Sequence, residues 1–380
     1  MDRVYLDHAA TSPMHPDVAC KMLPYMTEIF GNPSSIHHYG RQSRHALDEA
    51  RQSISHSIGA KPTEIIFTSG GTEADNLALI GVALANREKG NHIITTVIEH
   101  HAVLHTCEFL EAEGFEVTYL PVDENGLVSI KDIEEALTTE TIIVSIMYGN
   151  NEVGVVQPIK EIGELIQDHQ AVLHTDAVQA FGLIPIQVNE LGVDLLSVSG
   201  HKINGPKGTG FLYAREGIKI TPNLYGGEQE RKRRAGTENV AGIIGLAHAV
   251  HLSKQNLQER RADYLKFQEI FTGTLNQHKI VFNINGKSVE SLPHIINLSF
   301  PKTNVESMLV NLDLAGVSAS SGSACTAGSI DPSHVLVAMF GRNSDRVKSS
   351  IRFSFGLGNT EEQVRKAAEE TVKVVKRLTK

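Results

Sequence analysis

The chain has 380 residues, enough for a large core and two domains. It carries 35 Lys and Arg against 44 Asp and Glu, and the net charge of −9 argues against a general nucleic-acid-binding protein. No apolar run approaches the roughly 18 residues of a membrane span, the first residues lack the order of a signal peptide, and the 3 cysteines are too few for a disulfide framework, so we expect a cytoplasmic protein.

Short apolar runs alternate with segments of helical spacing through most of the chain. The runs predicted as strands are 65–68, 92–97, 141–147, 171–174, 194–199 and 210–213, and helical patterns follow at 72–87, from about 101, and at 159–166. This strand-then-helix order predicts an α/β fold with a mostly parallel sheet that helices cover on both faces. Ligands of such sheets bind at the carboxyl ends of the strands.

The pattern changes from about residue 259. A polar helical stretch leads to apolar runs at 279–284 and 295–300, and a final helix begins at the capping box formed by Thr360 and Gln363. The apolar stripe of this helix consists of Val364, Ala368, Val372 and Val375. We therefore predict a large domain over 16–258 and a smaller α+β domain formed by 1–15 and 259–380.

Thr68-Ser69-Gly70-Gly71-Thr72-Glu73 has the order of a strand, a glycine turn and a helix start. The free backbone N–H groups and the dipole of such a helix favour an anion, and the Thr72 hydroxyl can add a hydrogen bond. An ordinary turn with Thr72 as the helix N-cap is an equal alternative. The full dinucleotide fingerprint is absent, which disfavours NAD.

Glu99, His100 and His101 follow the next predicted strand, and His105 lies one helical turn after His101. The spacing of His101 and His105 hints at a metal, but no third ligand is evident, so we expect no metal site. A histidine at a strand end can stack on a flat cofactor or move protons. Capping of the following helix is the structural alternative.

Asp176 ends another apolar run, and a carboxylate delivered into the protein interior needs a partner. A protonated ring nitrogen is one such partner. The alternative is a helix N-cap at Asp176, with Gln179 completing a capping box. Asn150-Asn151-Glu152 also follows a strand, and turn chemistry explains this segment as well as a function does.

Gly200, His201 and Lys202 follow the apolar run 194–199. A lysine that loses solvent at a strand end can be neutral, and a neutral amine attacks aldehydes, which suggests a Schiff-base cofactor such as pyridoxal phosphate (PLP). PLP also needs an acid for its ring nitrogen, an aromatic plane and a helix N-terminus for its phosphate. Asp176, His100 and Thr72 occupy the neighbouring strand ends, so the set as a whole predicts a PLP site.

The stretch 320–329 is small, polar and rich in glycine, and it contains Cys325. We predict a mobile surface loop over about 318–332, from which an exposed thiol can reach a substrate and carry a product away. A non-reactive loop cysteine is the alternative. Cys20 and Cys107 lie in apolar helical patterns and are predicted to be packing residues.

Arg352 and the run from Glu230 to Arg234 carry charge next to apolar or turn segments. Arg352 alternates with apolar neighbours, and a semi-buried arginine needs an anionic partner, either a substrate carboxylate or a structural ion pair. The run from Glu230 to Arg234 is interpreted as a solvated loop.

At these motifs the chain resembles the class I (NifS/IscS-like) cysteine desulfurases of the class-V aminotransferase family. The matching segments are 5–11, 68–76, 99–100, 150–152, 176–179, 199–202, 234–237, 321–325 and Arg352, so the resemblance spans the chain. It implies PLP fold-type I, which is aspartate-aminotransferase-like, and a homodimer with the active site at the subunit interface.

The resemblance also implies a role for each matching cofactor residue. Lys202 would bind PLP covalently, His100 would stack on the ring and assist proton transfer, and Asp176 would pair with the ring nitrogen. Gln179 would bind the ring hydroxyl. The phosphate would be held by Gly71, Thr72, Ser199 and His201, together with Thr237 of the partner subunit.

The implied reaction converts L-cysteine to L-alanine. Asn151 and Arg352 would bind the substrate carboxylate, Lys202 is a plausible base, and Cys325 would take the sulfur as an enzyme persulfide. The persulfide would pass to an acceptor protein, either an iron–sulfur scaffold or a tRNA thiolation enzyme. No direct nucleic-acid binding is expected, and selenocysteine stays open as a substrate.

Two other functions remain as alternatives. An aminotransferase or β-lyase would use the same cofactor, although the Cys325 loop disfavours both. A binding platform that docks partners through 231–234 and the Cys325 loop belongs to a different class.

Overall fold

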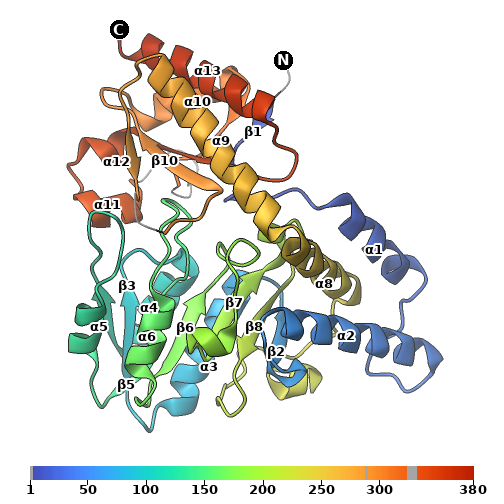
Figure 1. Ribbon diagram of the computed structural model, residues 1–380. Coiled ribbons are helices and arrows are strands. Elements are labelled where there is room, and N and C mark those ends of the chain that lie inside the picture. Colours follow the sequence, from blue (N-terminus) through green and yellow to red (C-terminus); the bar gives the residue numbers. More distant parts are fainter. Residues whose placement is uncertain (1–2, 287–289, 323–331) are drawn as a thin grey trace.

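The computed structural model describes residues 3–286, 290–322 and 332–380, and its main feature is a seven-stranded sheet (Figure 1). The strand order is β2-β8-β7-β6-β5-β3-β4. The strands are β2 (Ile65–Thr68), β3 (His92–Thr96), β4 (Glu116–Leu120), β5 (Thr141–Ser145), β6 (Val172–Asp176), β7 (Leu195–Ser199) and β8 (Gly210–Ala214).

The mostly parallel sheet predicted from the sequence is confirmed. Four neighbouring pairs are parallel, whereas β8 is antiparallel to both of its neighbours, β2 and β7. All the strands except β8 therefore run in the same direction, and their carboxyl ends lie along one edge of the sheet. This edge is where ligands bind in such folds.

Helices cover both faces of the sheet because its strands are apolar on both sides. In β3, Ile93 packs under α3 (Gly71–Asn86) and α4 (His101–Ala112), whereas Ile94 packs in the core on the opposite face. That opposite face is covered by α2 (His38–Ser57), α5 (Ile130–Ala136), α6 (Ile159–Ile166), α7 (Val188–Leu191) and α8 (Val240–Gln255). Near-continuous apolar runs are typical of strands buried on both faces.

A smaller α+β part contains both ends of the chain (Figure 1). Its antiparallel sheet has the order β12-β10-β9, and β1 pairs in parallel with β11. The strands are β1 (Val4–Tyr5), β9 (Asn283–Asn285), β10 (Ile295–Ser299), β11 (Val317–Ser318) and β12 (Ser350–Ser354), and the helices are α9 (Leu257–Gln277), α10 (Val305–Leu314), α11 (His334–Phe340), α12 (Asp345–Ser349) and α13 (Glu361–Leu378). The predicted capping box of Thr360 and Gln363 opens α13, and its predicted apolar stripe is buried.

The predicted boundary after residue 258 falls in the first turn of α9, and the division into two domains stays a prediction. Val4 and Leu6 pack in the core of the smaller part, whereas Ala9 packs in the core beside the large sheet. The N-terminal segment therefore runs from one part to the other, past the carboxyl edge of the sheet.

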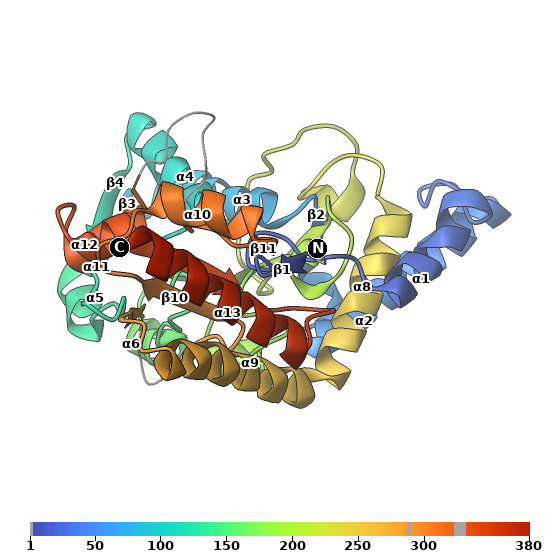
Figure 2. The same cartoon turned by 90° about the horizontal axis from the view of Figure 1, so that it is seen from above.

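The helix α1 (Pro16–Thr27) lies with the start of α2 at one side of the molecule (Figure 2). Val18 is the buried residue of α1, and Cys20 is exposed, so the packing role predicted for Cys20 is wrong. Only a narrow stripe of this helix is covered. Cys107 is buried in α4, as predicted. Within the described ranges, no helix has the length and apolarity of a membrane span.

The solvated-loop interpretation of residues 230–234 agrees with the exposed Arg231 and Lys232 but is wrong for Glu230. Glu230 is buried and accepts two hydrogen bonds from Arg51, of 2.6 and 2.9 Å, and one of 3.0 Å from the backbone N–H of Phe67. Arg234 pairs with Glu73 in the first turn of α3. Glu230 and Arg234 therefore form ion pairs to distant parts of the chain, whereas Lys232 pairs with its neighbour Glu228 at the surface.

Candidate active site

A cavity of about 370 Å³ lies at the carboxyl edge of the large sheet. The predicted residues that line it are Gly71, Thr72, His100, Asn151, Asp176, Gln179, Ser199, His201, Lys202 and Arg352. Thr237 is exposed and does not line this cavity, and Cys325 lies outside the described residues. Another cavity, of about 500 Å³, is lined by charged side chains that pair with one another, including Arg51 with Glu230, so we place the site in the smaller one.

Lys202 lies in a short 3-10 helix, Gly200–Ile203, directly after β7. Its Nζ donates hydrogen bonds to the carbonyl oxygens of Ala9 and Ala10, the second at 2.8 Å. Loss of solvent and the nearby Arg352 lower the pKa of Lys202 to about 7. A substantial neutral fraction of the amine is therefore present near neutral pH, and the neutral amine is the nucleophilic form.

Asp176 is the last residue of β6 and is buried, and its Oδ1 accepts a hydrogen bond of 2.8 Å from the N–H of Val178. Burial raises the pKa of this carboxyl group above its usual range. The capping-box alternative is wrong, because no helix begins here and Gln179 Nε2 donates to the carbonyl of Ala9 at 2.9 Å. A buried carboxylate at the wall of a cavity suits a cationic nitrogen in that cavity.

The glycine turn after β2 leads directly into α3, with Gly70 as the N-cap. The alternative that Thr72 is the N-cap is therefore wrong. Gly70 has no side chain to accept from the first N–H groups of the helix, so these donors stay available at the cavity wall. A Cβ on Gly71 would lie 2.7 Å from Val178 Cγ2, so the turn passes close to the segment after Asp176. The geometry favours a bound anion.

His100 is the N-cap of α4, and its Nδ1 accepts a hydrogen bond of 3.1 Å from the N–H of Ala102. The capping interpretation is thus confirmed, but the same ring lines the cavity. The surrounding protein and the charge of Lys202 lower the pKa of His100 to about 4, so the ring is neutral near pH 7. A neutral ring can stack on a planar group, and because Nδ1 accepts from Ala102, the ring proton is on Nε2.

His101 is close to two other imidazole rings. Its ring centroid lies 4.9 Å from that of His105 and 4.8 Å from that of His334. In the described part of the chain, no group of three His, Cys, Asp or Glu side chains is arranged to hold a metal ion.

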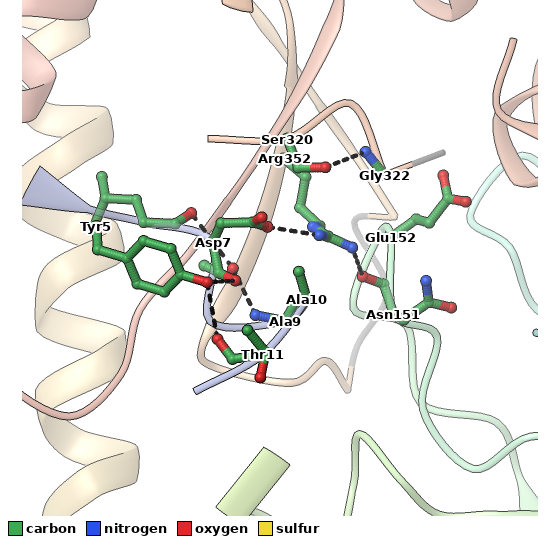
Figure 3. A network of polar contacts seen from close by, with 12 residues as sticks. Tyr5, Asp7, Ala9, Ala10, Thr11, Asn151, Glu152, Ser320, Gly322 and Arg352 are labelled. Atoms are coloured by element: carbon green, nitrogen blue, oxygen red, sulfur yellow. Dashed lines mark hydrogen bonds and ion pairs between the residues drawn. The ribbon is translucent and has the colours of Figure 1, made fainter. Parts of the chain in front are cut away.

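Arg352 is the third residue of β12 and is 3% exposed. Its Nη2 donates to Asp7 Oδ1 at 2.7 Å, and its Nη1 donates to the carbonyl oxygen of Asn151 at 2.8 Å (Figure 3). The expected anionic partner is thus Asp7 in the protein itself, although the guanidinium also lines the cavity.

Sequence reasoning assigned no role to three buried acids around the cavity. Asp75, Glu99 and Glu152 are each at most 1% exposed, and burial raises the pKa of all three, that of Glu99 to about 8. Asp75 and Glu152 line the cavity, and Glu152 accepts a hydrogen bond from Ser333. Each acid lies within or beside a motif that was identified, but local sequence does not reveal how deeply a polar residue is buried.

The fold and the site define this protein as an α/β enzyme of PLP fold-type I. The family model described as aminotransferase class-V matches residues 4–366, and the chain belongs to this family.

Named relatives agree with this assignment. The chain is 63% identical over 379 residues to a putative cysteine desulfurase IscS 1 of Bacillus subtilis (strain 168), with 100% of both chains covered. It is 50% identical over 376 residues to a cysteine desulfurase IscS of Methanosarcina thermophila, with 99% of this chain and 92% of the relative covered. A solved structure described as a NifS-like protein superposes with a TM-score of 0.92 at 35% identity, covering 99% of this chain and 100% of the other.

Proposed function

We propose that this chain is a PLP-dependent cysteine desulfurase, which converts L-cysteine to L-alanine and transfers the sulfur to an acceptor protein. The observation that carries the proposal is the convergence of Lys202, Asp176 and the N-terminus of α3 on one cavity, in a chain 63% identical to a relative named as a putative cysteine desulfurase. PLP is the cofactor of the family to which the chain belongs.

The residues of the cavity fit this cofactor. The N–H groups of Gly71 and Thr72 would hold the phosphate, with Ser199 and His201 beside them. At another part of the wall, the buried Asp176 carboxylate would pair with a protonated ring nitrogen, and Gln179 would bind the ring hydroxyl. The amine of Lys202, neutral in substantial fraction near pH 7, would attach the cofactor.

When bound, PLP supplies an electron sink for negative charge that develops on the substrate Cα. Lys202 Nζ, once released, would take the proton from that carbon. The neutral His100 ring would stack on the cofactor and assist the proton transfers. Arg352 and Asn151, which both line the cavity, would bind the substrate carboxylate.

Cys325 would be the nucleophile that takes the sulfur. Its thiolate attacks the substrate sulfur, the Cβ–S bond breaks, and the electron pair stays with the carbon fragment, which becomes alanine after protonation. The two described cysteines are unsuited, because neither lines the cavity and burial raises the pKa of Cys107 to about 12. Gly322 and His334, which lie on either side of Cys325 in the sequence, both line the cavity.

The proposal includes a homodimer in which Thr237 of the partner subunit completes the phosphate site. Thr237 is exposed and does not line the cavity of its own chain, as a residue donated to a partner should be. The acceptor of the persulfide would be an iron–sulfur scaffold or a tRNA thiolation enzyme.

The test is to incubate the purified protein with L-cysteine and a thiol reductant and to measure every product. A desulfurase releases alanine and sulfide in equal amounts. A β-lyase instead gives pyruvate and ammonia, and an aminotransferase needs a keto acid to which it transfers the amino group. A protein that turns over none of these substrates but still retains partners fits the binding-platform alternative.

A further inference from the structure

Asp7 and Arg352 form an ion pair at the cavity wall, between residues 345 positions apart in the sequence. Asp7 follows β1, whereas Arg352 lies in β12, and the second bond of the guanidinium goes to the carbonyl of Asn151 after β5. Figure 3 shows Arg352 lying between Asp7 and Asn151. The arginine thus joins the N-terminal segment to a turn of the large sheet.

The backbone around Asp7 is fixed on several sides. Asp7 forms a β-bridge with Ser354, whose N–H donates to the carbonyl of Leu6 at 2.8 Å. The hydroxyl of Tyr5 donates to the carbonyl oxygens of Asp7, at 3.0 Å, and Thr11, at 2.9 Å (Figure 3). The backbone of Asp7 is therefore held in place independently of the ion pair with Arg352.

Charge balance gives this pair a chemical consequence. Arg352 is 3% exposed, and a buried guanidinium without a partner would be costly. It also lies close enough to Lys202 to lower the pKa of that amine, whereas Asp7 and Asp176 raise it. Among the described residues, the imidazoles of His100, His201 and His294 also interact with Lys202, and burial lowers their pKa values to about 4, 4 and 3. Near neutral pH, Asp7 therefore opposes the effect of Arg352 on the lysine.

We propose that Asp7 is a positioning residue of this active site, which holds the Arg352 guanidinium against the cavity wall and balances its charge beside Lys202. The proposal rests on the proposed function, in which Arg352 binds a substrate carboxylate next to the lysine that attaches the cofactor. The negative charge of Asp7 would offset the positive charge of Arg352, so that the arginine can bind the substrate without lowering the pKa of Lys202 as far as it would alone.

The first test measures the pKa of Lys202 in the full-length protein after removal of the cofactor. Complete rebinding of PLP afterwards shows that the protein has stayed folded. Only the neutral amine attacks an aldehyde, so the pH dependence of the rate of reaction with pyridoxal reports this pKa. We expect Asp7→Asn to lower the pKa of Lys202, Arg352→Gln to raise it, and the double variant to lie between the two. A decrease of about one unit from 7 would raise the neutral fraction at pH 6 about fivefold.

A matched control is available in the pair of Asp194 and Arg215. This pair is 2.9 Å long, and the Asp194 side chain is 23% exposed, close to the 22% of Asp7, but neither residue lines the cavity. Asp194→Asn should leave the pKa of Lys202 unchanged. Asp7→Glu, which keeps a carboxylate beside Arg352, should show the wild-type pKa of Lys202.

The second test uses steady-state kinetics with L-cysteine. Asp7→Ala should raise KM about tenfold, the loss expected for one hydrogen bond to a charged group, with a smaller effect on kcat.

An Asp7→Asn protein that folds and reloads with cofactor, but keeps the wild-type pKa of Lys202, overturns the proposal. So do single variants that shift this pKa in the same direction. If the wild-type protein makes no alanine from cysteine while the pKa values shift as stated, the proposed function fails and the role of Asp7 stands.

Discussion

Lys202 donates a hydrogen bond of 2.8 Å to the carbonyl oxygen of Ala10, which joins the end of β7 to the N-terminal segment. The same segment bonds to Gln179 through Ala9 and to Arg352 through Asp7. Residues from both ends of the chain therefore form one wall of the cavity. The carbonyl oxygens of Ala9 and Ala10 give the amine of Lys202 defined hydrogen-bond partners.

Replacement of Lys202 by Ala should abolish covalent attachment of PLP. This variant lacks the Lys202 amine, which lies at the cavity wall and whose pKa is lowered to about 7. We expect the visible absorption band of the bound cofactor to disappear after gel filtration. Lys207→Ala, which removes an exposed lysine five residues away, should keep the band. An unchanged spectrum in the Lys202 variant would mean that another residue holds the cofactor.

The buried pair of Arg51 and Glu230 should matter for stability. Glu230→Ala leaves the guanidinium of Arg51, whose side chain is 9% exposed, without its carboxylate, and such a loss costs about 3 to 5 kcal/mol of unfolding free energy. Urea unfolding of the variant measures this. The matched control is Glu216→Ala, which breaks the exposed pair with Lys61 and should leave the unfolding midpoint almost unchanged. Equal midpoints for the two variants would show that Glu230 contributes no more than a surface residue.

Glu99 should make the stability of the protein fall as the pH rises. Burial raises the pKa of Glu99 from 4.5 to about 8 in the folded state, so the folded protein holds this proton more tightly than the unfolded chain. The resulting stabilisation is fully present below pH 4.5 and is lost as the pH rises through about 8.

The Glu99→Gln variant cannot ionise at this position, so its unfolding free energy should decrease less than that of the wild type between pH 6 and pH 9. Urea unfolding at both pH values measures the difference. Glu116→Gln, at an exposed position in β4, should follow the wild type. A Glu99→Gln protein with the wild-type slope would show that Glu99 is ionised in the folded state.

The sequence allowed the strands around the site to be predicted, because each carries a continuous apolar run. The runs at 65–68 and 210–213 correspond closely to β2 and β8, but periodicity does not reveal that β8 is antiparallel to its neighbours. The edge strand β4 was missed, since most of Glu116–Leu120 is only partly buried and its sequence lacks a long apolar run.

The cavity residues could be predicted where chemistry and a strand end coincide, as at Lys202 and Asp176. The contacts between distant parts of the chain could not. Asp7 and Arg352 are 345 residues apart, and Arg51 and Glu230 are 179 apart, so no local pattern links either pair. For the same reason, the burial of Glu230 within the run 230–234 could not be predicted.

The most direct test of the proposed reaction is to follow carbon and sulfur from labelled L-cysteine in the wild type and in Cys325→Ser. The wild type should release alanine, and mass spectrometry without reductant should find one additional sulfur atom on the peptide that contains Cys325. The Cys325→Ser protein should still bind PLP and L-cysteine but release no alanine or sulfide. Normal turnover in that variant, or no alanine from the wild-type protein loaded with PLP, would contradict the account.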